Sequence, residues 1–260
     1  VLIFYFCSPI ILYACYFHSQ LDLVPTALLF ACIYMLKKKK LATSSLLLGL
    51  SLSTKFHIAA AIPLIAIYLF KNTTLKKTIL FIGGSFGVFF ILASPYLFTS
   101  GYKYLVLQHP KQMMLFDFFV SLGMLKVYLP IFVLIVVYGR FVAYSKINND
   151  LLDAFLAITF SCLVLLIPPA PGWYVWMHPF LSVLFIKYSR FNSFLTILYF
   201  VLVITYCLFF VLFYDSGRQD LFFLSTPISL MLPYAKITNI VFTLLETAIF
   251  LIIYFLYKCG

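Results

Sequence analysis

The segment His18-Ser19-Gln20-Leu21-Asp22 is a polar island between two apolar runs, residues 1–17 and 21–36. His18, Gln20 and Asp22 bring an imidazole, an amide and a carboxylate together, and such groups can hold a polar ligand or move a proton. Removing them from water is costly, so a cluster at the edge of an apolar run is typical of a surface that meets water or a ligand. The island is therefore the first candidate for chemistry, although Asp22 also suits the N-cap of the apolar helix that follows.

Lys55 and His57 lie inside an otherwise apolar stretch, residues 41–70. A charged residue there usually faces a cavity or a partner, and the alternative is that the lysine extends its ammonium to the membrane surface. A single histidine is more often a hydrogen-bonded packing residue, and this reading stays open for His57.

His109, Lys111 and Gln112 form a polar cluster ahead of the apolar run that begins at Met113. An imidazole, an ammonium and an amide together can hold a phosphate or a sugar. A solvated loop explains the same residues equally well.

Trp173, Trp176 and His178 surround the Pro171-Gly172 turn. Tryptophans beside an apolar segment commonly form the aromatic belt of a membrane boundary. Packing of a sugar face on an indole ring is the functional alternative.

The composition places these residues in a membrane protein. Hydrophobic residues make up 65% of the 260 residues and charged residues only 10%, against about 25% charged residues in a soluble domain. No stretch is left for a soluble domain, so we expect one multi-pass domain over residues 1–260. The net charge of +11 comes from short clusters beside apolar runs, which indicates membrane topology and not nucleic-acid binding. The six cysteines lack zinc-site spacing, and no metal ligands are assigned.

The fold class expected is all-α: a polytopic bundle of about 8–10 membrane helices, some short or broken. The candidate helices are 1–17, 21–36, 41–54, 58–70, 78–98, 118–138, 151–168, 175–186, 193–213 and 237–257. Residues 41–70 could be one long helix or a hairpin that breaks at residues 54–57.

Charge favours the hairpin, because cytoplasmic loops carry the excess of Lys and Arg. With a hairpin, twelve basic residues share the inner side: Lys37, Lys38, Lys39, Lys40, Lys71, Lys76, Lys77, Arg140, Lys146, Lys187, Arg190 and Lys258. Four lie outside: Lys103, Lys111, Arg218 and Lys236. A single crossing gives eight on each side. His18, His109 and His178 then lie on the outer side, so a site is expected to face outward.

The order of several short motifs resembles GT-C superfamily glycosyltransferases, which are integral-membrane enzymes that use a polyprenyl-phosphate sugar. The resemblance covers about residues 8–70 and rests on Ser8-Pro9, the island with Val24-Pro25, the lysines at 37–40, Gly49-Leu50 before Lys55, and Ile62-Pro63. Ser19 stands where glycine is usual in the family. Later, His109-Pro110-x-Gln112 and Pro171-Gly172-Trp173-x-x-Trp176-x-x-Pro179 extend it.

The resemblance implies sugar transfer at the extracytoplasmic or luminal face, with a hexose such as mannose as one option. Asp22 is then the catalytic candidate, as acceptor orienter, metal ligand or base. The substrate-binding candidates are His18, Gln20, Lys55, His57, His109, Lys111, Gln112, Trp173, Trp176 and His178, among which Lys55 suits the donor phosphate. No cofactor is implied with certainty, and a divalent metal stays open.

The implied partners are the polyprenyl-phosphate sugar, a lipid-linked, glycan or protein acceptor, and membrane lipid, without nucleic acid. The implied location is the bacterial inner membrane or the endoplasmic reticulum membrane. A flippase or transporter for a lipid-linked sugar is the main alternative, and a membrane polysaccharide polymerase is another. Because Val1 opens inside an apolar run and the family carries an acidic residue in its first outer loop, an upstream helix is expected.

Overall fold

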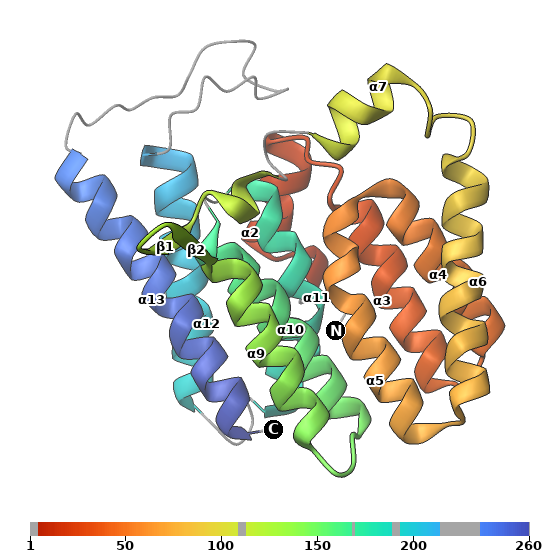
Figure 1. Ribbon diagram of the computed structural model, residues 1–260. Coiled ribbons are helices and arrows are strands. Elements are labelled where there is room, and N and C mark those ends of the chain that lie inside the picture. Colours follow the sequence, from red (N-terminus) through yellow and green to blue (C-terminus); the bar gives the residue numbers. More distant parts are fainter. Residues whose placement is uncertain (1–4, 109–112, 168–169, 189–192, 214–234, 260) are drawn as a thin grey trace. The chain divides into compact units, whose positions relative to one another are not determined.

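The computed structural model describes residues 5–108, 113–167, 170–188, 193–213 and 235–259 (Figure 1). This part of the chain is mostly helical, 82%, with 11 α-helices and a single two-stranded hairpin. The prediction of an all-α protein is therefore confirmed. The chain groups into two compact units, residues 24–168 and residues 1–23 with 169–260, which are described separately below. The single domain over residues 1–260 stays a prediction.

The larger unit begins with four helices joined by short turns. They are α3 (Leu23–Lys37), α4 (Leu41–Thr54), α5 (Ile62–Asn72) and α6 (Leu75–Ala93), with the 3₁₀ helix η2 (Phe56–Ala61) between α4 and α5. Lys55 is extended, with φ −155° and ψ 139°, so no continuous helix crosses it. Thr74 begins α6 by accepting a hydrogen bond from the Lys77 amide. The predicted break at residues 54–57 is confirmed.

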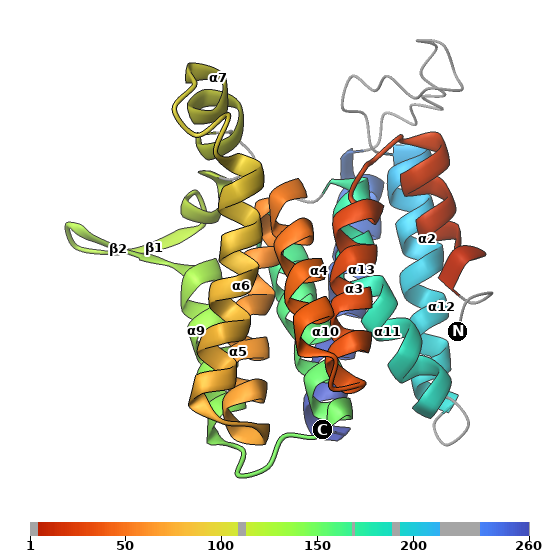
Figure 2. The same ribbon diagram turned by 90° about the vertical axis from the view of Figure 1, so that its right-hand side faces the viewer.

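Helices α4 and α6 run in the same direction, as their paired contacts show. The Ser45 hydroxyl donates to the Phe81 carbonyl over 2.8 Å, and one turn further on a Cβ at Gly49 would lie 2.6 Å from the Ser85 carbonyl oxygen. Small residues of this kind allow helix backbones to approach closely in membranes. The single helix between them, α5, must then run in the opposite direction, as Figures 1 and 2 show. The hairpin interpretation of residues 41–70 is therefore confirmed.

The predicted helix over residues 118–138 is wrong in its first half. Strands β1 (Phe119–Leu122) and β2 (Leu125–Tyr128) pair antiparallel there, and α9 begins only at Leu129 (Figure 2). Gly123 opens the two-residue turn with φ +65°, a conformation that glycine adopts readily. Lys126 falls inside the predicted helix 118–138 but lies on β2, with its ammonium 4.0 Å from the centre of the Phe119 ring.

The rest of this unit is short helical segments and two further long helices. The short segments are α7 (Ser100–Tyr102), η3 (Lys103–Leu107) and η4 (Met114–Phe116), and the long helices are α9 (Leu129–Ala143) and α10 (Asn149–Leu166). Asn148 caps α10, since its side-chain oxygen accepts from the Leu151 amide over 2.7 Å. Almost the whole of α10 is buried. Within this unit it packs against α9, α5 and η2.

The smaller unit joins the start of the chain to its last third. Its elements are α2 (Pro9–Leu12), the π-helix η1 (Tyr13–Phe17), η5 (Pro171–Trp173), α11 (Tyr174–Tyr188), α12 (Ser193–Cys207), η6 (Leu208–Phe213) and α13 (Ala235–Cys259). Helices α12 and α13 pack side by side. The buried rings of Tyr174, Tyr206 and Phe210 contact one another. They form an aromatic core behind the turn at Pro171.

Four helices of the described residues are long and apolar enough to cross a membrane. They cover Leu75–Ala93, Asn149–Leu166, Ser193–Val211 and Lys236–Lys258. Shorter apolar helices cover Leu23–Lys37, Leu41–Thr54, Phe56–Asn72 and Leu129–Ala143. The membrane character expected from composition is thus present in individual helices.

Candidate functional site

The polar island forms a tight turn after the π-helix η1. Ser19 has φ +53°, which is uncommon for a residue other than glycine. The backbone N–H of Gln20 closes the turn by donating to the Ala14 carbonyl over 2.9 Å. The half-buried His18 ring lies parallel to the Tyr13 ring, with 6.4 Å between centres. The backbone therefore fixes the directions in which His18, Gln20 and Asp22 leave the chain.

Asp22 contacts the tryptophan turn from the far end of the sequence. The Trp176 indole Nε1 donates to Asp22 Oδ1 over 3.0 Å, across 154 residues of sequence. Both side chains are buried, with 0% of Asp22 and 6% of Trp176 exposed. A hydrogen bond from a neutral donor to a buried carboxylate offsets part of the cost of removing that charge from water. We call this pair and its neighbours, Gln20 and Trp173, the Asp22–Trp176 site.

Gln20 and Trp173 complete this site through close packing. A Cβ at Gly172 would lie 2.6 Å from Gln20 Cγ, so only glycine lets the amide side chain approach this turn. The Trp173 and Trp176 rings stack, with centres 5.2 Å apart and planes at 24°. The structure thus brings together four of the residues that the sequence singled out. Their side chains offer a carboxylate, an amide and two indole faces.

Two contacts that the sequence did not predict hold the tryptophan turn in place. The Tyr206 hydroxyl donates to the Pro171 carbonyl over 3.0 Å, and the Tyr174 hydroxyl donates to Glu246 Oε1 over 3.5 Å. Glu246 falls inside the predicted helix 237–257, but the sequence did not indicate its partner. The sequence signal for this contact was Tyr174, which lies between Trp173 and Trp176 and carries a hydroxyl group that needs a partner when buried.

His178 belongs to a different set of contacts. Its ring Nε2 lies 3.4 Å from the Tyr199 hydroxyl, which donates to Ser8 Oγ over 3.3 Å. Residues two apart on a helix point in different directions, so His178 and Trp176 do not share a face of α11. His178 is fully buried and packs against the Tyr5 ring. Its geometry therefore fits a packing role.

Lys55 and His57 lie at the helix break of the larger unit. Both are half-buried, and the His57 ring meets the Phe160 ring edge-on, with 6.2 Å between centres. Lys55 is extended, and His57 lies two residues further on in η2. Their suggested role toward a phosphate stays a prediction. His109, Lys111 and Gln112 lie outside the residues that the structure describes.

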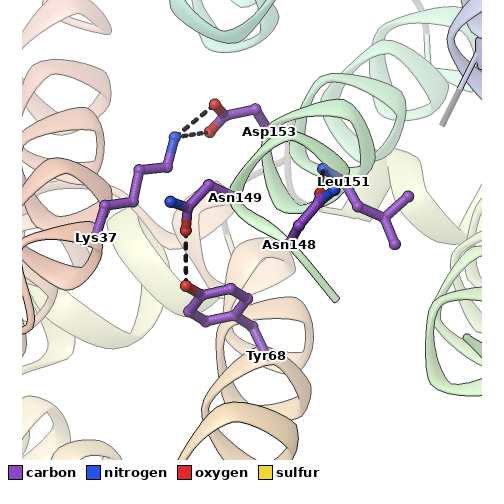
Figure 3. Close-up of polar contacts among 6 residues, drawn as sticks. All are labelled: Lys37, Tyr68, Asn148, Asn149, Leu151 and Asp153. Carbon is purple, nitrogen blue, oxygen red and sulfur yellow. Dashed lines mark hydrogen bonds and ion pairs between the residues drawn. The ribbon is translucent and has the colours of Figure 1, made fainter. Parts of the chain in front are cut away.

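An ion pair in the larger unit was missed altogether. Lys37 Nζ lies 2.6 and 2.5 Å from the two carboxylate oxygens of Asp153, which is 2% exposed (Figure 3). Beside it, the Tyr68 hydroxyl donates to Asn149 Oδ1 over 2.7 Å. An aspartate within the predicted helix 151–168 was the signal, because a carboxylate at such a position needs a partner.

The described residues contain no group of three or more His, Cys, Asp or Glu side chains that could hold a metal ion. Comparisons with models of protein families, with curated proteins and with solved structures found no match to this chain. The class that fold and site define is therefore a mostly helical protein with membrane-length apolar helices and a buried carboxylate–indole pair.

Proposed function

We propose that this chain is a polytopic membrane glycosyltransferase that uses a polyprenyl-phosphate sugar. One observation supports it most: the two stretches that carry the resemblance, around Asp22 and around Trp176, meet through a hydrogen bond of 3.0 Å. Neither stretch is specific alone. Their meeting is expected if both serve one site, and it is not expected if one is a helix cap and the other an aromatic belt.

In the proposed reaction, the acceptor hydroxyl oxygen attacks the anomeric carbon of the donor. A new C–O bond forms, the bond from that carbon to the phosphate oxygen breaks, and polyprenyl phosphate leaves with the bonding electrons. The acceptor proton has to be removed, and Asp22 can orient the hydroxyl or receive that proton. Since Asp22 is buried beside Trp176, acceptor binding must expose the carboxylate.

The indole faces of Trp173 and Trp176 suit the apolar face of a sugar ring, and the Gln20 amide can both donate to and accept from its hydroxyls. Lys55 is the proposed cation for the donor phosphate, because it is the charged residue at a break between apolar helices. The proposed setting is the extracytoplasmic or luminal side of a bacterial inner membrane or an endoplasmic reticulum membrane.

The test is sugar transfer by membranes that contain the chain, with a radiolabelled polyprenyl-phosphate hexose as donor. Transfer to a lipid-linked, glycan or protein acceptor that Asp22→Asn reduces at equal protein abundance supports the proposal. Movement of the labelled lipid across sealed vesicles without a new glycosidic bond would identify the flippase alternative. Repeated addition to a growing polymer would identify the polymerase alternative. Either result would overturn the proposal that the chain transfers one sugar from the donor to an acceptor.

A further inference from the structure

Basic side chains from three turns of the larger unit gather at one end of it. We call this set the basic end; its members are exposed, and they are Lys38, Lys39, Lys40, Lys76, Lys77 and Lys146. They lie in the turn 38–40 after α3, in the first turn of α6 directly after residues 73–74, and in the turn 144–148 before α10. Figures 1 and 2 show all three toward the lower end of this unit.

Hydrogen bonds tie two of these turns together. Lys71 donates to the carbonyls of Val142 and Tyr144. The side-chain amide of Asn72 donates to the Ile147 carbonyl over 3.0 Å. These contacts join the end of α5 to the turn that carries Lys146. The turns before α6 and before α10 are therefore joined and are not independent loops.

The starts of α4 and α6 also lie together. These helices run in the same direction, and Ser45 meets Phe81. Lys40 and Lys77 each lie about one turn before that contact, so the lysines at 38–40 and at 76–77 approach the same patch of surface. Lys37 is different, because its ammonium is already paired with Asp153.

The first turn of α6 makes this patch electrostatically unusual. Lys76 and Lys77 occupy it, and it contains no acidic residue. A helix N-terminus carries partial positive charge, so lysines there are unfavourable and an anion is favourable. The partial positive charge of the helix start, the two ammonium groups and the neighbouring lysines at 38–40 would all be complemented by one negatively charged group from outside the chain.

Helices α6 and α10 are both long and apolar enough to cross a membrane, and both begin at the basic end. Phosphate headgroups lie at the depth where such helices begin, and anionic lipids attract basic segments beside them. We propose that the basic end binds the headgroup of an anionic phospholipid, with the phosphodiester between the lysines at 38–40 and those at 76–77. This inference needs only the membrane placement of α6 and α10 and does not depend on sugar transfer.

The test uses the purified full chain in detergent micelles that contain equal amounts of phosphatidylglycerol and phosphatidylcholine. Native mass spectrometry then gives the ratio of the two lipids retained by the protein. We expect the wild-type chain to prefer phosphatidylglycerol, and K76Q/K77Q to lower that preference by on the order of tenfold. The matched control K103Q/K126Q removes two exposed lysines of the same unit that lie on other elements, and it should leave the preference unchanged.

K76R/K77R keeps both charges and should keep the preference, which separates loss of charge from loss of fold. K38Q/K39Q/K40Q provides an independent second variant with the same expected loss. An equal preference in K76Q/K77Q and wild type, or an equal fall in K103Q/K126Q, would overturn the proposal. Displacement of the lipid by millimolar glycerol phosphate would assign the patch to soluble phosphate compounds, and would overturn it as well.

Discussion

The indole nitrogen of Trp176 donates a hydrogen bond of 3.0 Å to the carboxylate of Asp22. Asp22 immediately precedes α3, and Trp176 lies in the first turn of α11. Both residues belong to the smaller unit, so the contact joins the two stretches of sequence that make up this unit. If Asp22 served only as the N-cap of α3, its carboxylate would accept hydrogen bonds from that helix alone and not from Trp176.

Asp22→Asn should reduce sugar transfer by about tenfold to a thousandfold, the range for loss of one charge or proton-transfer group. The asparagine oxygen can still accept from Trp176 and can still cap α3, so abundance and thermal stability should change little. Initial rates of transfer at equal protein abundance provide the measurement. An unchanged rate would leave Asp22 as a structural residue.

Trp176→Phe makes the complementary change, because it removes the donor and keeps Asp22. Loss of one hydrogen bond to a buried group costs about 1–3 kcal/mol, so the melting temperature should fall, in contrast to Asp22→Asn. Thermal unfolding in detergent, followed by circular dichroism, separates the two variants. Equal stability of Trp176→Phe and the wild type would show that the bond contributes nothing to folding.

Lys55→Met should raise the donor concentration needed for half-maximal transfer, because the proposed cation for the phosphate is gone. The dependence on acceptor concentration should stay the same. Lys126→Met is the matched control, since this lysine lies on the hairpin strand β2. If Lys55→Met needs the same donor concentration as the wild type for half-maximal transfer, Lys55 does not bind the donor phosphate.

Gly49→Ala should destabilise the larger unit by about 1–3 kcal/mol, as overpacking does. Its new methyl group would lie 2.6 Å from the backbone oxygen of Ser85, which cannot move like a flexible side chain. Gly87→Ala is the control, because nothing lies within 4 Å of the added carbon. That change should be neutral or slightly stabilising, since alanine favours helix. Equal melting temperatures for the two variants would contradict the close α4–α6 packing.

Cysteine labelling can test the topology in a variant that lacks the native cysteines. New thiols at Lys38 and Lys76 should react from one side of sealed vesicles, because both belong to the basic end. A thiol at Leu21, which is 74% exposed in the polar island, should react from the other side if positive charge orients the chain. Reaction of all three from one side would contradict the proposed topology.

The helical pattern of the larger unit was largely predictable because local residues decide it. Helix α4 has the predicted bounds, 41–54, and the charge asymmetry indicated the reversal after Lys55. The hairpin at residues 119–128 was missed because its strands are as apolar as a membrane helix. Only Gly123 and the alternation around it favoured a turn, and a short apolar run does not distinguish strand from helix.

The residues of the site were predictable individually, but their partners were not. Gln20, Asp22, Trp173 and Trp176 attracted notice as polar or aromatic groups beside apolar runs, and nothing local indicated that Asp22 would meet Trp176. Lys37 and Asp153 were missed as a pair for the same reason, since 116 residues separate them. Pairing between distant elements depends on how helices pack, which composition and spacing do not encode.

The shared direction of α4 and α6 has a consequence for biosynthesis. Helix α4 can pair with α3 soon after it is made, because Ser44 donates to the Cys32 carbonyl and Ser51 to the Pro25 carbonyl. Ser45 and Gly49 face a partner that the ribosome has not yet produced. Until Phe81 and Ser85 enter the membrane, this strip of α4 is open to lipid or to an insertion chaperone. Helix α5 must therefore be made and reversed before Phe81 and Ser85 can cover this strip, so the contact between α4 and α6 forms only after α5 is in place.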